Sequence, residues 1–355
     1  MFEYFNSGPS GTIAIIEIND PLSNEPSGVF ASFTLTGTGL EYGPDGNLIG
    51  GEIRSVVIDA GRLTFDGDGN TTFTNDPEIA DGNPNLVTLR GLSLSPAEFE
   101  ATATQFADDN DFFLIPDYSA SGTNLNSFGQ LDTSFTVLAE DNVSFVNLNS
   151  TSAPLTVFGD AGDNIITGAR YGDNLADEGN TIYGRGGDDL LFGGQTDDFI
   201  SGGQGDDRII GFGGNDILSG NAGDDVISKS GSGDSILRGG SGNDTLSGGR
   251  GDDRLVGGTG DDDLRGFNGD DRLIGGTGTD SFDGGTGVDT IVLRASSDTA
   301  TFGVDEDGDA FVTFIELDVS GDVSGEVTET FKNVERIYFI EDQAVIQTDA
   351  LTEIA

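Results

Sequence analysis

The chain has 355 residues, of which 57 are glycine and none is cysteine or histidine, and 15 basic against 63 acidic residues give a net charge of −48. That charge excludes nucleic acid as a partner and opposes binding to an anionic membrane surface. Without cysteine or histidine, a disulfide framework is impossible and the usual ligands of transition metals are missing. The remaining ligands are oxygen atoms, so hard cations are the expected partners.

Residues 1–155 are expected to form a β-rich, sandwich-like domain. Strand-like runs separated by turn signals cover residues 12–18, 29–37, 52–60, 134–139 and 143–148. One short helix is expected from Ser95, where a capping serine, a first-turn proline and Glu98 precede apolar residues on one face.

The N-terminal residues show no basic segment followed by an apolar one, so a cleaved signal peptide is not expected there. No stretch of the chain is long and apolar enough to span a bilayer.

From Gly184 to Val292 the sequence repeats every nine residues. Five units run without a break to Ser228, and the ten-residue stretch 229–238 (KSGSGDSILR) then interrupts the period. Six more units follow, which makes twelve with the interrupted one. A degenerate unit at 159–167 lies upstream, separated by an irregular segment.

Each position of the unit has its own residue type. Positions one to five are mostly glycine and predict a tight turn, position six is aspartate, and position eight is apolar, as in a short strand with one inward side chain. The apolar column consists of Leu191, Ile200, Ile209, Leu218, Ile227, Leu246, Leu255, Leu264, Leu273, Phe282 and Ile291.

This pattern, G-G-x-G-x-D-x-U-x, resembles the RTX, or hemolysin-type, calcium-binding repeats. The resemblance is close over 184–292 and loose over 159–183. It implies a right-handed parallel β-roll over residues 156–292, in which two units make one coil and coils stack at about 4.8 Å. Residues 293–355 are expected to cover the last coil with a β cap built on strands at 310–317 and 334–339, and to carry a secretion signal.

The resemblance also implies that calcium lies between stacked turns, held by the position-six aspartates and by backbone carbonyls. One edge carries Asp189, Asp207, Asp225, Asp244, Asp262 and Asp280; the other carries Asp198, Asp216, Asp234, Asp253, Asp271 and Asp289. Six turns leave five gaps on each edge, so ten calcium sites are expected.

Two irregularities weaken the second edge. Thr196 replaces the usual glycine at position four, and the extra residue in 229–238 leaves open whether Asp234 or Ser235 occupies position six. The additional aspartates at position five of many units are interpreted as solvated charge.

Proteins with such repeats are, by resemblance, exported unfolded through a type I channel by an uncleaved C-terminal signal, so an extracellular location is expected. Calcium is scarce inside the cell, whereas millimolar calcium outside saturates sites of about 10⁻⁴ to 10⁻³ M affinity. The binding energy then becomes folding energy.

The favoured interpretation is a secreted structural or adhesive protein, not an enzyme, that assembles with itself or with a cell-surface or matrix polymer. The alternative is a calcium-dependent enzyme that acts on polysaccharide. Composition excludes Ser-His-Asp, Cys-His and histidine–zinc chemistry, but it leaves open a pair of carboxylates in the N-terminal domain.

Overall fold

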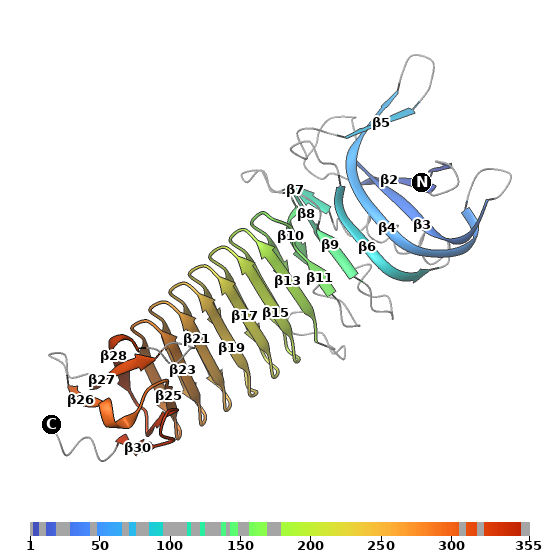
Figure 1. Ribbon diagram of the computed structural model, residues 1–355. Helices are drawn as coiled ribbons and strands as arrows, with labels where there is room; N and C mark the ends of the chain where they lie inside the picture. The colour runs from blue at the N-terminus through green and yellow to red at the C-terminus, as the bar shows by residue number, and fades with distance from the viewer. Residues whose placement is uncertain are drawn as a thin grey trace. The chain divides into compact units, whose positions relative to one another are not determined.

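The structure is a computed structural model (Figure 1). It describes residues 3–6, 12–18, 29–42, 48–65, 71–75, 85–94, 112–114, 121–124, 136–139, 143–147, 156–168, 179–304, 310–317 and 323–348. Apart from a single 3-10 turn at Ser297–Thr299, the regular elements among these residues are β-strands, so the described part of the chain has the all-β fold that the sequence predicts. It divides into two compact units, residues 1–185 and 186–355.

The first unit begins with antiparallel strands. In order of pairing they are β1 (Glu3–Asn6), β2 (Thr12–Ile18), β3 (Val29–Tyr42), β4 (Leu48–Phe65), β6 (Asn85–Leu94) and β9 (Thr136–Ala139), with β5 (Thr71–Asn75) also paired to β4. The strands predicted at 12–18, 29–37 and 52–60 are confirmed as β2, β3 and β4. Both β3 and β4 are longer than predicted, because their pairing continues past a register shift at Gly37.

Parallel pairing starts within the same unit. β8 (Ser121–Asn124), β10 (Val143–Asn147) and β12 (Ile165–Thr167) pair in one series, and β9, β11 (Thr156–Phe158) and β13 (Thr181–Gly186) in another; β7 (Phe112–Leu114) pairs antiparallel with β8. Val157, Ile166 and Ile182 are fully buried at the centres of β11, β12 and β13. The helix predicted from Ser95 lies outside the described residues, and the sandwich-like packing and the boundary at residue 155 stay predictions.

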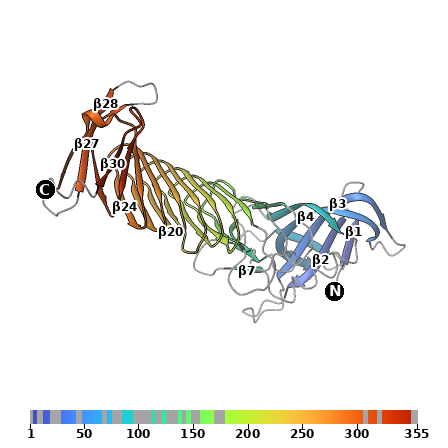
Figure 2. The ribbon, with the colours of Figure 1, turned by 90° about the horizontal axis from the view of Figure 1, so that it is seen from below.

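The second unit is a parallel β-solenoid with two sheets (Figures 1 and 2). One sheet contains β14 (Leu190–Gly194), β16 (Arg208–Phe212), β18 (Val226–Ser228), β20 (Thr245–Arg250), β22 (Asp263–Asn268) and β24 (Ser281–Thr286). The other contains β15 (Phe199–Gln204), β17 (Ile217–Ala222), β19 (Ile236–Ser241), β21 (Arg254–Thr259), β23 (Arg272–Thr277) and β25 (Thr290–Leu293). Each strand therefore pairs with the strand one full coil, or two units, later.

The apolar column and the turn glycines account for this fold. Every position-eight residue predicted to face inward is buried, with at most 1% of its surface exposed. At position four, Gly205 has φ +114°, and a Cβ there would lie 2.2 Å from the Gly187 carbonyl oxygen of the preceding coil. Only glycine allows the turns to stack this closely.

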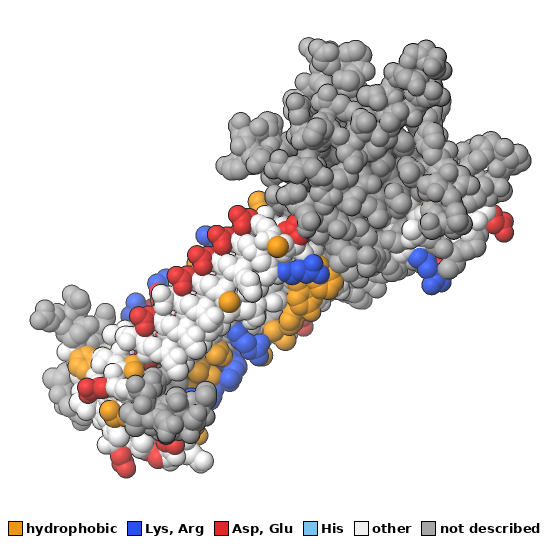
Figure 3. Space-filling model, turned by 45° about the horizontal axis from the view of Figure 1, so that its top comes forward, with side chains coloured by type: hydrophobic (Ala, Val, Ile, Leu, Met, Phe, Trp, Pro, Cys, Tyr) orange, Lys and Arg blue, Asp and Glu red, His pale blue; other side chains and the backbone are white. Residues whose placement is uncertain are grey.

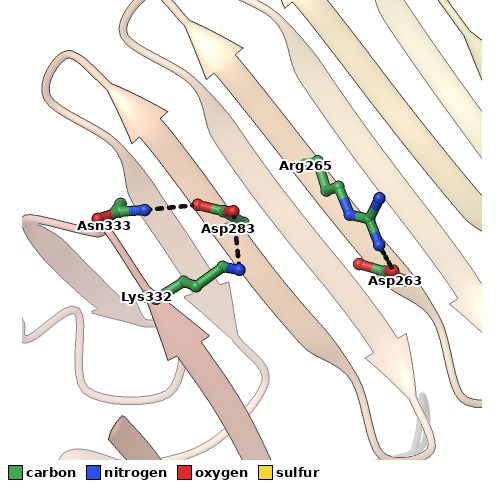
Figure 4. Close-up of polar contacts among 5 residues, drawn as sticks. All are labelled: Asp263, Arg265, Asp283, Lys332 and Asn333. Carbon is green, nitrogen blue, oxygen red and sulfur yellow. Dashed lines mark hydrogen bonds and ion pairs between the residues drawn. The ribbon is translucent and has the colours of Figure 1, made fainter. Parts of the chain in front are cut away.

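The predicted C-terminal cap is confirmed. Its strands are β26 (Thr301–Val304), β27 (Ala310–Leu317), β28 (Val323–Lys332), β29 (Arg336–Phe339) and β30 (Val345–Gln347). β28 pairs in parallel with β24, and β29 with β25, so the cap continues the solenoid, with Phe331 and Ile337 buried in register with the apolar column. Lys332 and Asn333 both contact the Asp283 carboxylate of β24, at 3.2 and 2.8 Å (Figure 4).

Candidate metal sites

The position-six side chains form two hydrogen-bonded columns, one along each edge of the solenoid. The Asp207 Oδ1 accepts a hydrogen bond of 2.8 Å from the Asp189 backbone N–H, one coil earlier. The same bond recurs in every later coil of that edge. On the second edge it runs through Asp216, Asp253, Asp271 and Asp289, with Ser235 between Asp216 and Asp253. Each turn is thereby linked to the next by a carboxylate, except that the Ser235 hydroxyl accepts the hydrogen bond from the Asp216 N–H.

The second oxygen of these carboxylates is buried. Oδ2 has no hydrogen-bond partner in Asp207, Asp216, Asp225, Asp244, Asp253, Asp262, Asp271 and Asp289. These side chains are at most 2% exposed. Position one shows where the atom lies: a Cβ on Gly202 would be 2.0 Å from the Asp207 Oδ2. The oxygen therefore points into the interior of its own turn.

Burial sets the protonation of these groups. Loss of solvent and, to a smaller extent, the charges of neighbouring carboxylates together raise the pKa of Asp216, Asp225, Asp262 and Asp271 to about 7, against the lowering effect of a backbone hydrogen bond. The same causes raise the pKa of Asp207, Asp244, Asp253 and Asp289 to about 6. A buried carboxylate without a counter-charge is costly, and a cation between the turns would remove that cost.

The donor set fits calcium. Among the described residues there is no cluster of three or more carboxylates, so any ion here would need backbone carbonyls beside the aspartates. The glycine turns bring such a carbonyl to the buried oxygen, since a Cβ on Gly257 would lie 2.1 Å from the Asp262 Oδ2 and 2.7 Å from the Gly275 carbonyl oxygen of the next coil. Calcium accepts six to eight oxygen ligands in adaptable geometry, whereas magnesium demands a strict octahedron.

Position five carries a second ladder that the sequence did not predict. The Asp188 Oδ1 accepts a 2.8 Å hydrogen bond from the Asp206 backbone N–H, and the pattern repeats along both edges. These side chains are exposed, as expected of solvated charge. Figure 3 shows a line of acidic side chains along one edge. Asn215 and Asn243 take part in the ladder, so the side chain at position five needs only an oxygen that accepts a hydrogen bond.

Two glutamates of the cap extend the position-six columns. The buried Glu329 carboxylate accepts a hydrogen bond from the Asp280 backbone N–H, and the Glu335 Oε2 accepts one of 2.8 Å from Asp289. Neither glutamate was predicted from the sequence, because they lie 49 and 46 residues beyond their partners and outside the nine-residue period. The signal was an acidic residue two positions before an apolar one, in Glu329-Thr330-Phe331 and Glu335-Arg336-Ile337.

Two departures from the columns concern the predicted ligands, and a third lies upstream of them. Ser235, 2% exposed, occupies position six of the interrupted unit, and Asp234 lies in the exposed position-five ladder instead. Asp198 stands in its column, but its Oδ2 accepts a 2.6 Å hydrogen bond from the Gly194 N–H. Upstream, the residues that precede β12 and β13 are the buried amides Asn164 and Asn180, which carry no charge.

A parallel β-roll with buried carboxylates stacked at its turns defines a calcium-binding repeat protein. A sequence model described as the RTX calcium-binding nonapeptide repeat matches residues 156–170, 177–200, 192–227, 230–264 and 265–300. Residues 156–300 therefore carry RTX calcium-binding nonapeptide repeats. No curated protein matches the chain.

Proposed function

We propose that this protein is an extracellular structural or adhesive protein whose β-roll folds when calcium binds between its stacked turns. The observation that carries the proposal is the column of buried Oδ2 atoms without hydrogen-bond partners. Stacked carboxylates a few ångströms apart repel each other by about 1 kcal/mol or more per pair even in a high dielectric. Calcium in each gap replaces that repulsion with attraction, so the ion is part of the fold.

The proposed ligands follow from the columns. They are the position-six aspartates of the sequence prediction, with Ser235 in the place of Asp234 and with Glu329 and Glu335 added at the cap. Five gaps per edge lie between the repeat turns, and the glutamates define one further gap on each edge. The gaps beside Ser235 and Asp198 differ from the rest, because each lacks one buried carboxylate oxygen that is free to bind an ion.

An extracellular location follows from the same energetics. A net charge of −48 and 57 glycines disfavour compaction where calcium is scarce. Millimolar calcium saturates sites of about 10⁻⁴ to 10⁻³ M affinity. Folding would therefore follow export, in agreement with the type I secretion that the repeats imply. No helix in the described part of the chain meets the length and hydropathy needed to cross a membrane.

The adhesive role is inferred from the different roles proposed for the two units of the chain. Calcium binding stiffens residues 186–355, which leaves the N-terminal unit as the surface for self-assembly or for a matrix polymer. The absence of histidine and cysteine removes most hydrolytic mechanisms from that unit.

The test is a calcium titration of the full-length chain, followed by hydrogen exchange of the repeat peptides and by light scattering. Protection of residues 186–292 should appear with calcium and not with an equal concentration of magnesium. Scattering that rises with the same midpoint supports calcium-dependent assembly, whereas a monomer at all concentrations contradicts it. Repeat peptides protected equally in chelator would contradict calcium-driven folding.

A further inference from the structure

The interrupted turn contains a buried lysine. Lys229 directly follows β18 and is only 3% exposed. Its Nζ donates to the Gly233 carbonyl of its own turn and, at 3.4 Å, to the Arg250 carbonyl of the next turn on the same edge. The ammonium therefore lies between two stacked turns and is bound by backbone carbonyl oxygens, the ligand type that calcium would use there.

Two substitutions in this unit compensate each other. Ser228 pairs with Ile210 and Ser247, so Lys229 is equivalent to Gly211 and Gly248 at position one. In regular units that position must be glycine, because the position-six Oδ2 occupies the space of a Cβ; on Gly220 the Cβ would lie 1.9 Å from the Asp225 Oδ2. In the interrupted unit position six is the smaller Ser235, which leaves room for the lysine.

The charges also compensate. Replacing glycine by lysine adds one positive charge, and replacing aspartate by serine removes one negative charge. Together they equal the charge of one divalent cation. The Lys229 ammonium faces Asp216 in the preceding turn and Asp253 in the following turn, and it opposes the rise in pKa that burial causes in both. The charges of other carboxylates also act on these two aspartates. One of them, Asp198, lies within the column, and the others, Asp197, Asp234 and Asp252, lie outside it.

We infer that the Lys229 ammonium takes the place of a calcium ion in the gap between the turns at 229–235 and 248–253. This inference rests on the proposed function, since it assumes that the neighbouring gaps hold calcium. The Lys229 ammonium then occupies this gap as a resident cation at every calcium concentration. The second edge binds one calcium ion fewer than its number of turns indicates. The coil around Ser235 stays ordered at calcium concentrations too low to fill the neighbouring gaps.

The test counts calcium ions on the full-length protein by native mass spectrometry at saturating calcium. Lys229→Met keeps Ser235 and a side chain of similar length but removes the ammonium, so the calcium concentration at the folding midpoint should rise, because the gap has lost its resident cation. Lys229→Gly combined with Ser235→Asp restores both regular residues, and the count should rise by one. The matched control is Lys332→Met, because Lys332 is the only other lysine of the chain and pairs with Asp283 in the cap. Its count should not change.

The outcomes separate this inference from the proposed function. A wild-type chain that binds no calcium contradicts the proposed function itself. A wild type that binds calcium, with a Lys229→Met midpoint equal to that of Lys332→Met, overturns the role of Lys229. So does a double variant that folds and keeps the wild-type count. If the double variant does not fold, Lys229→Met still decides, because its midpoint either rises above that of Lys332→Met and supports the inference or equals it and contradicts the inference.

Discussion

Asp262 and Asp198 occupy the same position in their units, yet their carboxylates are bonded differently. The Asp262 Oδ1 accepts from the Asp244 N–H at 2.8 Å, and its Oδ2 is buried without a hydrogen bond. The Asp198 Oδ2 instead accepts from Gly194, beside a turn in which Thr196 replaces glycine. Of these two residues, only Asp262 has a buried Oδ2 that accepts no hydrogen bond and can bind a cation.

This difference predicts unequal effects of alanine. Asp262→Ala removes a ligand from two regular gaps, those towards Asp244 and Asp280, so the calcium concentration at the folding midpoint should rise about threefold or more. Asp198→Ala should raise it by less than half as much on a logarithmic scale, because its gap is weaker from the start. One calcium titration of each variant, followed by circular dichroism, gives both midpoints. Equal shifts would show that the two edges are equivalent.

The raised pKa values of the column predict opposite effects of pH with and without calcium. Burial raises the pKa of Asp216, Asp225 and Asp262 to about 7, above the ordinary value of about 4. A carboxyl with a raised pKa binds more protons in the folded than in the unfolded chain. Without calcium, its contribution to stability is therefore complete below about pH 4 and is lost as the pH rises through about 7.

In chelator, the amount of β structure should consequently increase as the pH falls from 8 to 5. With calcium the order reverses, because binding requires ionised carboxylates and protons compete with the metal. The midpoint calcium concentration should then rise as the pH falls from 8 to 6. Far-ultraviolet circular dichroism at each pH measures both trends. A midpoint that does not depend on pH in this window would mean that the buried carboxylates are already ionised without metal.

At the scale of elements, the cap completes the metal columns as well as the apolar column. Glu335 precedes β29 and accepts a hydrogen bond from the Asp289 N–H. Ile337 of β29 is buried and pairs with Ile291. Glu335→Gln keeps an oxygen that can accept this bond but removes the charge. We expect the cap to need about threefold more calcium to become ordered, since one ligand charge is lost from the last gap.

Hydrogen exchange of β25 and β29 against calcium concentration measures this effect. Glu326→Gln is the control, because Glu326 also lies in the cap but is exposed. If both variants shift the midpoint equally, the change reflects net charge and not a ligand at Glu335.

At the scale of the molecule, we expect the solenoid to need metal in order to fold, because its apolar burial is small. Each nine-residue unit contributes one fully buried apolar side chain, worth about 1.5 to 3 kcal/mol. Ordering one residue costs about 1 to 2 kcal/mol of backbone entropy. Removal of calcium from the full chain should therefore expose the amides of β14 to β25 to exchange. Persistence of their protection after exhaustive chelation would show that the apolar column suffices.

The sequence alone determined the repeating part of the molecule, because a nine-residue period fixes both the inward side chain and the turn residue of every coil. The position-eight core, the position-six columns and the parallel roll follow from residues whose partners lie 18 positions away, or 19 across the inserted residue. Local spacing carries all the information that such contacts need.

Tertiary structure decided the exceptions. An insertion of one residue permits two registers, and only the pairing of β19 with β17 and β21 places Ser235 in the column and Asp234 outside it. Lys229 became visible as a resident cation only when its ammonium was seen between two turns. Glu329 and Glu335 lie in a cap without repeats, where separations of 49 and 46 residues follow from chain folding and from no period in the sequence.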